Sequence, residues 1–180
     1  MKKPRYAMTM DVRRCVGCNA CVLACKAENA LPENGYRDWI VTETAGKFPD
    51  LRQEIRSERC NHCDHPPCVC CCPTGASHVN EAGTVLVTPE KCTGCKACIA
   101  SCPYDARYIH HQGYADKCTF CLHRVRRGDE PACVSICPTS ALHFGDLSDP
   151  QSEVARLLDT RAHKTLQTER GLKPNVYFLS

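Results

Sequence analysis

The sequence predicts an α+β fold in which short strands and short helices are joined by much loop. Cysteine makes up 18 of the 180 residues, and sixteen of these cysteines fall into four quartets. The quartets share two spacing patterns, each used twice, and the apolar runs between them are short. We therefore expect bound metal centres to take the place of much of an apolar core.

The quartets differ in how closely their cysteines are spaced. The first and third both read CxxCxxCxxxC, and they are Cys15, Cys18, Cys21, Cys25 and Cys92, Cys95, Cys98, Cys102. The second and fourth are wider, and they are Cys60, Cys63, Cys68, Cys72 and Cys118, Cys121, Cys133, Cys137. In bacterial ferredoxins the closely spaced run holds 4Fe–4S clusters, and its fourth cysteine binds the neighbouring cluster.

Disulfides and zinc are the competing explanations for so many cysteines. Disulfides do not require a repeated CxxCxxCxxxC, because cysteines three residues apart on a tight loop face a common centre. A structural zinc site needs two separated CxxC pairs and leaves the third cysteine of each run unused. The pattern favours four 4Fe–4S clusters, whose default chemistry is the transfer of single electrons.

The sequence also indicates an internal duplication. RCVGCNACVLAC aligns with KCTGCKACIASC, and PPCVCCCPTGA aligns with PACVSICPTSA. We predict a duplicated bacterial-ferredoxin-like fold of two units, each with two clusters. The predicted segments are an outer unit at 1–30 plus 104–147, an inner unit at 56–103, an inserted hairpin or loop at 31–55, and a helix with an extended tail at 148–180.

The ligand sets depend on which quartets exchange their fourth cysteines. The second quartet could pair with the first or with the third. We choose the third, because GASHVNEAGTVLVTPEKC joins them as in a two-cluster ferredoxin. The predicted sites are site A (Cys15, Cys18, Cys21, Cys137), site B (Cys118, Cys121, Cys133, Cys25), site C (Cys60, Cys63, Cys68, Cys102) and site D (Cys92, Cys95, Cys98, Cys72).

Four residues near these ligands have no assigned ligand role. We interpret Cys70 and Cys71 as buried spectator thiols, because Cys72 keeps the spacing to a following proline that other quartets have. No cysteine is missing from the second quartet. His62 and His65 are therefore expected to be hydrogen-bond donors near a cluster or simply loop residues.

Short strands are predicted at Val85–Val87 and Ala141–Phe144. Trp39–Val41 and Arg52–Ile55 could pair as a hairpin that covers a cluster, and a loop that docks on a partner is the alternative. The helices after the cysteine runs should be only a turn or two long.

A longer helix is predicted near the carboxy terminus. Ser148-Asp149-Pro150 provides a cap and a first-turn proline, and Val154, Leu157 and Leu158 form an apolar stripe. The tail that follows ends in an apolar stretch, GLKPNVYFLS. We expect it to be extended and to dock on the body of the protein or on a partner.

Charge and hydropathy exclude several classes of function. The formal net charge is +3, but sixteen thiolates with four oxidised clusters would bring it to about −5. Binding to nucleic acid therefore lacks an electrostatic basis. No segment approaches a membrane span. The first residues lack the apolar region of a signal peptide, so any export is expected to rely on a partner.

The motifs closely resemble one family along nearly the whole chain. CVGCNACVLACKAEN, CNHCDHPPCV, CTGCKACIASCPYDAR, KCTFCLHR and PACVSICPTSALHFGDL occur in the order seen in the four-cluster electron-transfer subunits of molybdopterin oxidoreductases. KCTFCLHR, CPYDARY, FGDLSDPQS and KPNVYFL resemble the polysulfide and thiosulfate reductase branch.

This resemblance implies a subunit that is not catalytic by itself. It would relay electrons between a large molybdenum or tungsten pterin subunit and an integral membrane subunit that reacts with quinone. The periplasmic side of the membrane is the expected location, reached by export with a partner, and the cytoplasm is the alternative. A free polyferredoxin shuttle and a zinc-stabilised interaction module are the other hypotheses.

Overall fold

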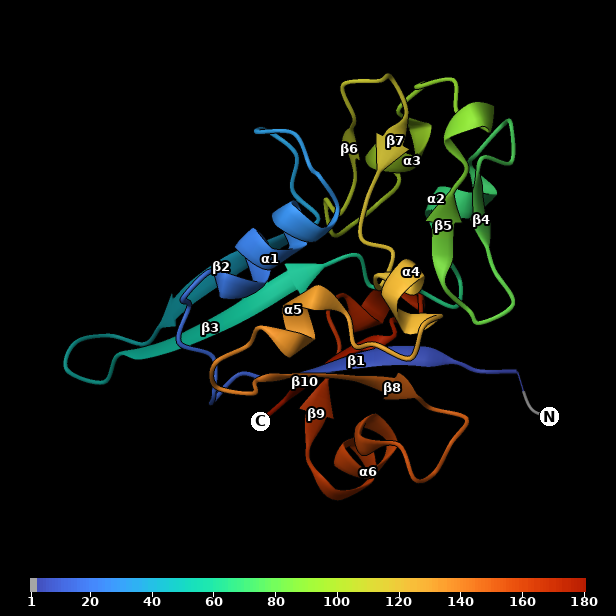
Figure 1. Cartoon of the computed structure of the whole chain (residues 1–180). Helices are drawn as coiled ribbons and strands as arrows, with labels where there is room; N and C mark the ends of the chain where they lie inside the picture. The colour runs from blue at the N-terminus through green and yellow to red at the C-terminus, as the bar shows by residue number, and fades with distance from the viewer. Residues whose placement is uncertain (1–2) are drawn as a thin grey trace.

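A four-stranded sheet brings the two ends of the chain together in this computed structural model, which describes residues 3–180. The first two residues of the predicted segment 1–30 lie outside the described residues. The strand order is β8-β1-β10-β9, formed by Leu142–Asp146, Tyr6–Asp11, Val176–Leu179 and His163–Lys164. Strand β1 is antiparallel to β8 and parallel to β10 (Figure 1). The amino-terminal strand thus lies between two strands from the carboxy-terminal part of the chain.

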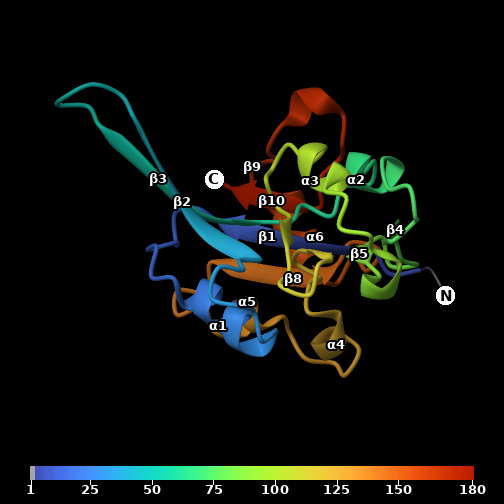
Figure 2. The same cartoon turned by 90° about the horizontal axis from the view of Figure 1, so that it is seen from above.

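Three hairpins complete the strands. They are β2–β3 (Asp38–Ala45, Arg52–Arg59), β4–β5 (Ser77–Val79, Val85–Val87) and β6–β7 (Tyr108–Ile109, Ala115–Asp116). The predicted hairpin is confirmed, with strands longer than the sequence indicated, and its tip projects from the body (Figure 2). The predicted strand at Val85–Val87 is also confirmed.

The helices are short, as the sequence predicted. They are α1 (Ala20–Glu28), α2 (Pro67–Cys70), α3 (Ala97–Ala100), α4 (Leu122–Val125), α5 (Ala132–Ser135) and α6 (Glu153–Thr160), with 3-10 turns η1 (Pro89–Lys91) and η2 (Thr168–Arg170). Helix α1 packs against α5, and α2 packs against α3. None of the helices within residues 3–180 has the length and hydrophobicity needed to cross a bilayer.

The two closely spaced cysteine runs have the same local backbone. Gly17 and Gly94 both have φ of 66°, and Asn19 and Lys96, which precede α1 and α3, have φ of 61° and 62°. These left-handed conformations turn the loop sharply before each helix begins. Equivalent positions in the first and third quartets therefore present their sulfurs in the same way.

The carboxy-terminal helix begins later than the sequence predicted. Ser152 is its N-cap, and the Ser152 side chain accepts a hydrogen bond from the Ala155 N–H at 3.2 Å. The predicted cap at Ser148-Asp149-Pro150 is a turn, in which the Asp149 carboxylate accepts from the Gln151 N–H. Two cap signals compete in this segment, and the serine followed by Glu153 begins the helix.

The core consists of sheet residues and cysteines together. Met8, Met10, Leu142, Val176 and Phe178 of the sheet are buried with cysteines of three quartets. The tail therefore docks on the body as strand β10, one of the two alternatives that the sequence left open. Helix α6 packs on β8 and β1 through the fully buried Val154.

Candidate metal centres

The four cysteines predicted for site D line one cavity. Cys72, Cys92, Cys95 and Cys98 line it together with Ser77, Arg107 and Ala115. Cys98 is buried and Cys95 is exposed. Helix α3 and the loop before it provide Cys92, Cys95 and Cys98, and the turn that follows α2 provides Cys72.

The four cysteines predicted for site A line a second cavity. Cys15, Cys18, Cys21 and Cys137 line it together with Met10 and Leu142 of the sheet. Proximity to Cys137 contributes to raising the pKa of Cys15, after the larger effect of burial. The first and last quartets thus meet in space, although 92 residues lie between Cys25 and Cys118 in the sequence.

The sulfurs predicted for site C also lie near one another. Burial, followed by the charges of Cys60, Cys68 and Cys102, raises the pKa of Cys63 to about 12. Burial also raises the pKa of Cys68 to about 11, with Cys60 and Cys102 adding to the effect. Three of the four cysteines are buried, and Cys102 is half-buried.

Site B is the most enclosed of the four groups, because all its cysteines are buried. Burial raises the pKa of Cys25, and the charges of Cys118 and Cys121 raise it further. The pKa of Cys133 is raised well above its usual value, first by burial, and Cys118 and Cys25 act in the same direction. Thiols in such a site bind as thiolates only if a cation compensates their charge.

Backbone N–H groups point at several of these sulfurs. The N–H of Ser77 donates to Cys72 Sγ at 3.4 Å, and the N–H of Ala141 donates to Cys137 Sγ at 3.3 Å. The Ser77 N–H is the main cause of the lowered pKa of Cys72. At Cys137, burial opposes the shift, and the Ala141 N–H and its neighbours outweigh it to lower the pKa. Such donors stabilise a metal-bound thiolate.

Three fully or nearly fully buried cations lie among the four sites. Arg59 is 2%, Arg107 is 5% and Lys117 is 1% exposed. Arg107 Nη2 donates to Cys68 Sγ at 2.9 Å, and Arg59 Nη1 donates to Cys133 Sγ at 3.4 Å. The sequence marks Arg59 and Lys117 only as basic residues beside a ligand, whereas Arg107 has no marker other than its position five residues after Cys102.

Each of these cations interacts with sulfurs of two different sites. Burial opposes the charge of Arg59, but Asp38 and then the sulfurs of Cys133, Cys118 and Cys21, from sites B and A, raise its pKa. Burial lowers the pKa of Lys117, against the opposing effect of Cys60, Cys118 and Cys68, from sites C and B. Burial also opposes the charge of Arg107, but Cys68, Cys60 and Cys98, from sites C and D, raise its pKa. The spatial order of the sites is therefore A, B, C, D.

Several buried donors of these side chains lack a protein acceptor. Among the described residues, Arg59 Nε and both Nε and Nη1 of Arg107 have no hydrogen-bond partner. Buried guanidinium N–H groups require acceptors. Sulfides of a cluster would supply them, so the thiols, N–H donors and cations fit a 4Fe–4S group at each site.

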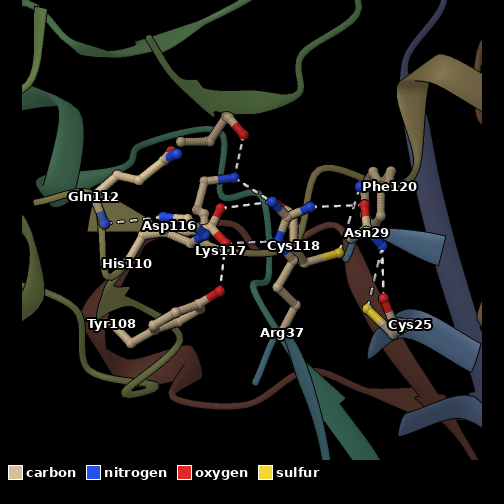
Figure 3. A network of polar contacts seen from close by, with 11 residues as sticks. Cys25, Asn29, Arg37, Tyr108, His110, Gln112, Asp116, Lys117, Cys118 and Phe120 are labelled. Carbon is tan, nitrogen blue, oxygen red and sulfur yellow. Dashed lines mark hydrogen bonds and ion pairs between the residues drawn. The ribbon is translucent and has the colours of Figure 1, made fainter. Parts of the chain in front are cut away.

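A polar network supports site B from the side of the β6–β7 hairpin (Figure 3). Arg37 forms a bidentate pair with Asp116, with Nε and Nη2 donating at 2.9 and 2.8 Å. Arg37 Nη1 also donates to Asn29, whose amide donates to the Cys25 carbonyl oxygen at 2.9 Å. This network fixes the end of α1, on which Cys25 lies.

The spare cysteines differ from the prediction. Cys70 and Cys71 are exposed, so their interpretation as buried thiols is wrong. Helix α2 buries Cys68, whereas Cys70 at its end and Cys71 after it face outward. Cys71 Sγ contacts Ser101 Oγ at 3.2 Å. His65 is exposed.

His62 is buried, and its Nδ1 accepts from the Val85 N–H at 3.2 Å. Burial, with the nearby Lys117, Arg107 and Arg59, holds the pKa of His62 well below its usual value. The imidazole is therefore neutral.

A site for a single metal ion is not formed among residues 3–180, where no three His, Cys, Asp or Glu side chains are close enough to share one ion. The sulfurs of sites A and D line cavities instead.

Comparison with known proteins gives consistent matches. The model of the 4Fe-4S dicluster domain family matches residues 51–147. The sequence is 43% identical to a polysulfide reductase chain of Wolinella succinogenes, over 97% of this chain and 94% of that protein. It is 42% identical to a tetrathionate reductase subunit of Salmonella typhimurium, over 97% and 72% respectively. It is 46% identical to protein NrfC of Escherichia coli, over 96% and 79%.

Proposed function

This protein belongs to the 4Fe-4S dicluster family of iron–sulfur subunits of reductase complexes. We therefore propose that it conducts electrons through four clusters, one at each of sites A to D. A bound 4Fe–4S cluster accepts and releases one electron. The chain's own residues hold the clusters, order them and set their surroundings. Since each quartet is complete, no iron is left open for a substrate, in keeping with a non-catalytic subunit.

The proposed ligands are the sixteen cysteines of the four predicted sites. Support comes from the cavities lined by the sulfurs of sites A and D, and from the electrostatic contacts within sites B and C. The unpartnered Arg107 donors are the single observation that carries the proposal furthest, because they need an acceptor that the described residues do not provide.

The pattern of exposure supports conduction from end to end. Cys18 of site A and Cys95 of site D are exposed, whereas all cysteines of site B are buried. An electron would enter at one exposed end, pass the two inner sites and leave at the other end. Shielded inner sites also protect the passing electron from oxidants in solution.

We further propose that the fold arose by duplication, with an outer unit at 1–30 plus 104–147 and an inner unit at 56–103. The equal φ values of Gly17 and Gly94 support equivalent loops. The hydrogen bonds to Cys72 and Cys137 support equivalent turns after α2 and α5. The segment 31–55 would be an insertion and 148–180 an addition.

The proposed partners are a large molybdopterin subunit and an integral membrane subunit that reacts with quinone. Relatives whose names make them components of tetrathionate and polysulfide reductases support a place in a complex of this class. Export with the large partner to the periplasmic side of the membrane is part of the proposal.

Metal analysis of the anaerobically purified chain tests the clusters. We expect about sixteen iron and sixteen sulfide per chain, with little zinc. About four zinc with no sulfide would instead support a zinc-stabilised module and reject the proposal.

Affinity purification from the native host tests the complex. We expect a large pterin-containing protein to co-purify in equal amount with the tagged chain. A stable monomer that keeps all its clusters and has no large partner would favour a free electron shuttle.

A further inference from the structure

Buried charge is distributed unevenly along the four sites. At the junction of sites A and B, Arg59 Nη2 lies 3.0 Å from Asp38 Oδ2, and both side chains are buried. The carboxylate cancels most of the field of this guanidinium at the neighbouring sites. Arg37, beside site B, is likewise paired with Asp116. These two cations therefore add little net positive charge.

Lys117, between sites B and C, has no such compensation. Its Nζ donates to the backbone carbonyl oxygens of Val85 and Cys118. Within the described residues it forms no ion pair with a carboxylate. Lys117 directly precedes Cys118 of site B. Val85, whose carbonyl oxygen accepts from Lys117, donates its N–H to His62, the neighbour of Cys63 in site C.

Arg107, between sites C and D, is also uncompensated. Its Nη2 donates to Cys68 Sγ and to Ser77 Oγ, both at 2.9 Å. No carboxylate among residues 3–180 pairs with it, and its remaining donors have no protein acceptor. The guanidinium is thus directed toward sulfur.

The number of buried cations without a carboxylate partner therefore differs from site to site. Site C lies between both uncompensated cations, sites B and D each have one, and site A has none. His62, which is also near site C, accepts the Val85 N–H at its Nδ1, so this ring nitrogen carries no proton. Solvent screens exposed cations such as Lys91 and Lys96.

We propose that Lys117 and Arg107 give site C the highest reduction potential of the four sites, so that an electron passing along the chain is held there. Reduction adds one electron and makes the cluster more negative, and a nearby cation stabilises the reduced form. The effect is strong because both cations act through a buried, weakly polarisable region. This inference rests on the proposed function, since it requires clusters at these sites.

Redox titration of the full chain, monitored by electron paramagnetic resonance under anaerobic conditions, tests the proposal. Lys117→Met and Arg107→Gln should each lower the reduction potential of the highest-potential cluster. The expected change is about tenfold in the equilibrium constant for its reduction, which corresponds to about 59 mV. Each variant should also lower one other signal, and this second signal should differ between the variants.

Matched variants separate charge from structure. Lys117→Arg and Arg107→Lys keep the charge and should keep the potentials close to wild type. Lys96→Met removes an exposed cation beside Cys95. It should change the equilibrium constant for reduction of any cluster by no more than about twofold. A merely structural role would make the conservative variants shift as much as the neutral ones.

The proposal is overturned if the variants retain full iron and sulfide but leave the highest-potential signal unmoved, or move unrelated signals. Should the neutral variants lose clusters, Cys102→Ser provides a second test, because it changes a ligand of site C. The highest-potential signal should then be altered or lost, and a change in a different signal instead rejects the proposal. Absence of iron and sulfide from the wild-type chain would reject the proposed function itself.

Discussion

A Cβ atom at Gly94 would lie 2.5 Å from the carbonyl oxygen of Gly113. Gly94 lies between Cys92 and Cys95 in the loop of site D, where its φ is 66°. The equivalent Gly17 of site A has the same φ, but its nearest neighbour would be the Ile55 side chain at 3.2 Å. A backbone carbonyl cannot yield as a side chain can, so these two loops differ in their tolerance of a methyl group.

Gly94→Ala should therefore prevent the site D loop from closing around its cluster. We expect the variant to lose about a quarter of its iron and sulfide, corresponding to one cluster of four. Gly17→Ala, which has the same backbone strain without the clash, should retain more iron. Equal losses in the two variants would mean that φ alone decides and that the contact with Gly113 is unimportant.

Alkylation of thiols should distinguish ligands from spare cysteines. In the native, cluster-containing chain we expect iodoacetamide to modify Cys70 and Cys71, which are exposed and have no proposed ligand role. Cys18 and Cys95 are also exposed, but coordination should protect them. Peptide mass spectrometry gives the result, and rapid modification of Cys18 or Cys95 would contradict their assignment as ligands.

The pair between Arg37 and Asp116 should contribute strongly to stability. Both side chains are largely buried, so Asp116→Asn leaves a buried guanidinium without a counter-ion at a cost of about 3 kcal/mol. Urea titration of the cluster-containing protein measures the loss. The exposed pair of Arg127 and Asp129, 3.6 Å apart, supplies the control, and Asp129→Asn should have no measurable effect.

The pair between Asp11 and Arg161 predicts how stability depends on pH. Burial alone would raise the pKa of Asp11, but the hydrogen bond and charge of Arg161, with the Arg13 N–H, lower it. The pair therefore stabilises the folded state fully at pH values above the pKa of Asp11 in the unfolded chain, about 3.9. This contribution is lost as the pH falls through the lower pKa of Asp11 in the folded chain.

Arg161→Ala should accordingly cause the same small decrease in thermal midpoint throughout the range from about pH 6 to about pH 8. Arg127→Ala, at an exposed position, provides the control. An effect of Arg161→Ala that changes steeply within this range would show that another titrating group is involved.

The groups of cysteines could be predicted because spacing constrains them locally. A loop with Gly17 or Gly94 can point three sulfurs at one centre, and the swapped fourth cysteine then follows from the chain path. That each group binds a cluster stays a prediction. The burial of Arg107 could not be predicted, because the cysteines that surround it come from distant segments.

The strand order of the central sheet also could not be predicted from the sequence. The strand predicted at Ala141–Phe144 corresponds to β8, which spans Leu142–Asp146. Its pairing with β1, and the parallel pairing of β1 with β10, join distant segments for which no local pattern exists. Cysteine is usually a buried residue, but Cys70 is the last residue of α2 and Cys71 follows it, and both are exposed.

The position of β1 between β8 and β10 has a consequence for synthesis on the ribosome. The proposed ligands of sites C and D all lie between Cys60 and Cys102, so these sites can be complete while the rest of the chain is still being made. Sites A and B need Cys137 and Cys133, and the strand before Cys15 acquires both neighbours only when Leu179 has emerged. We therefore expect metal loading to proceed from the middle of the chain outward, with sites C and D filled before sites A and B.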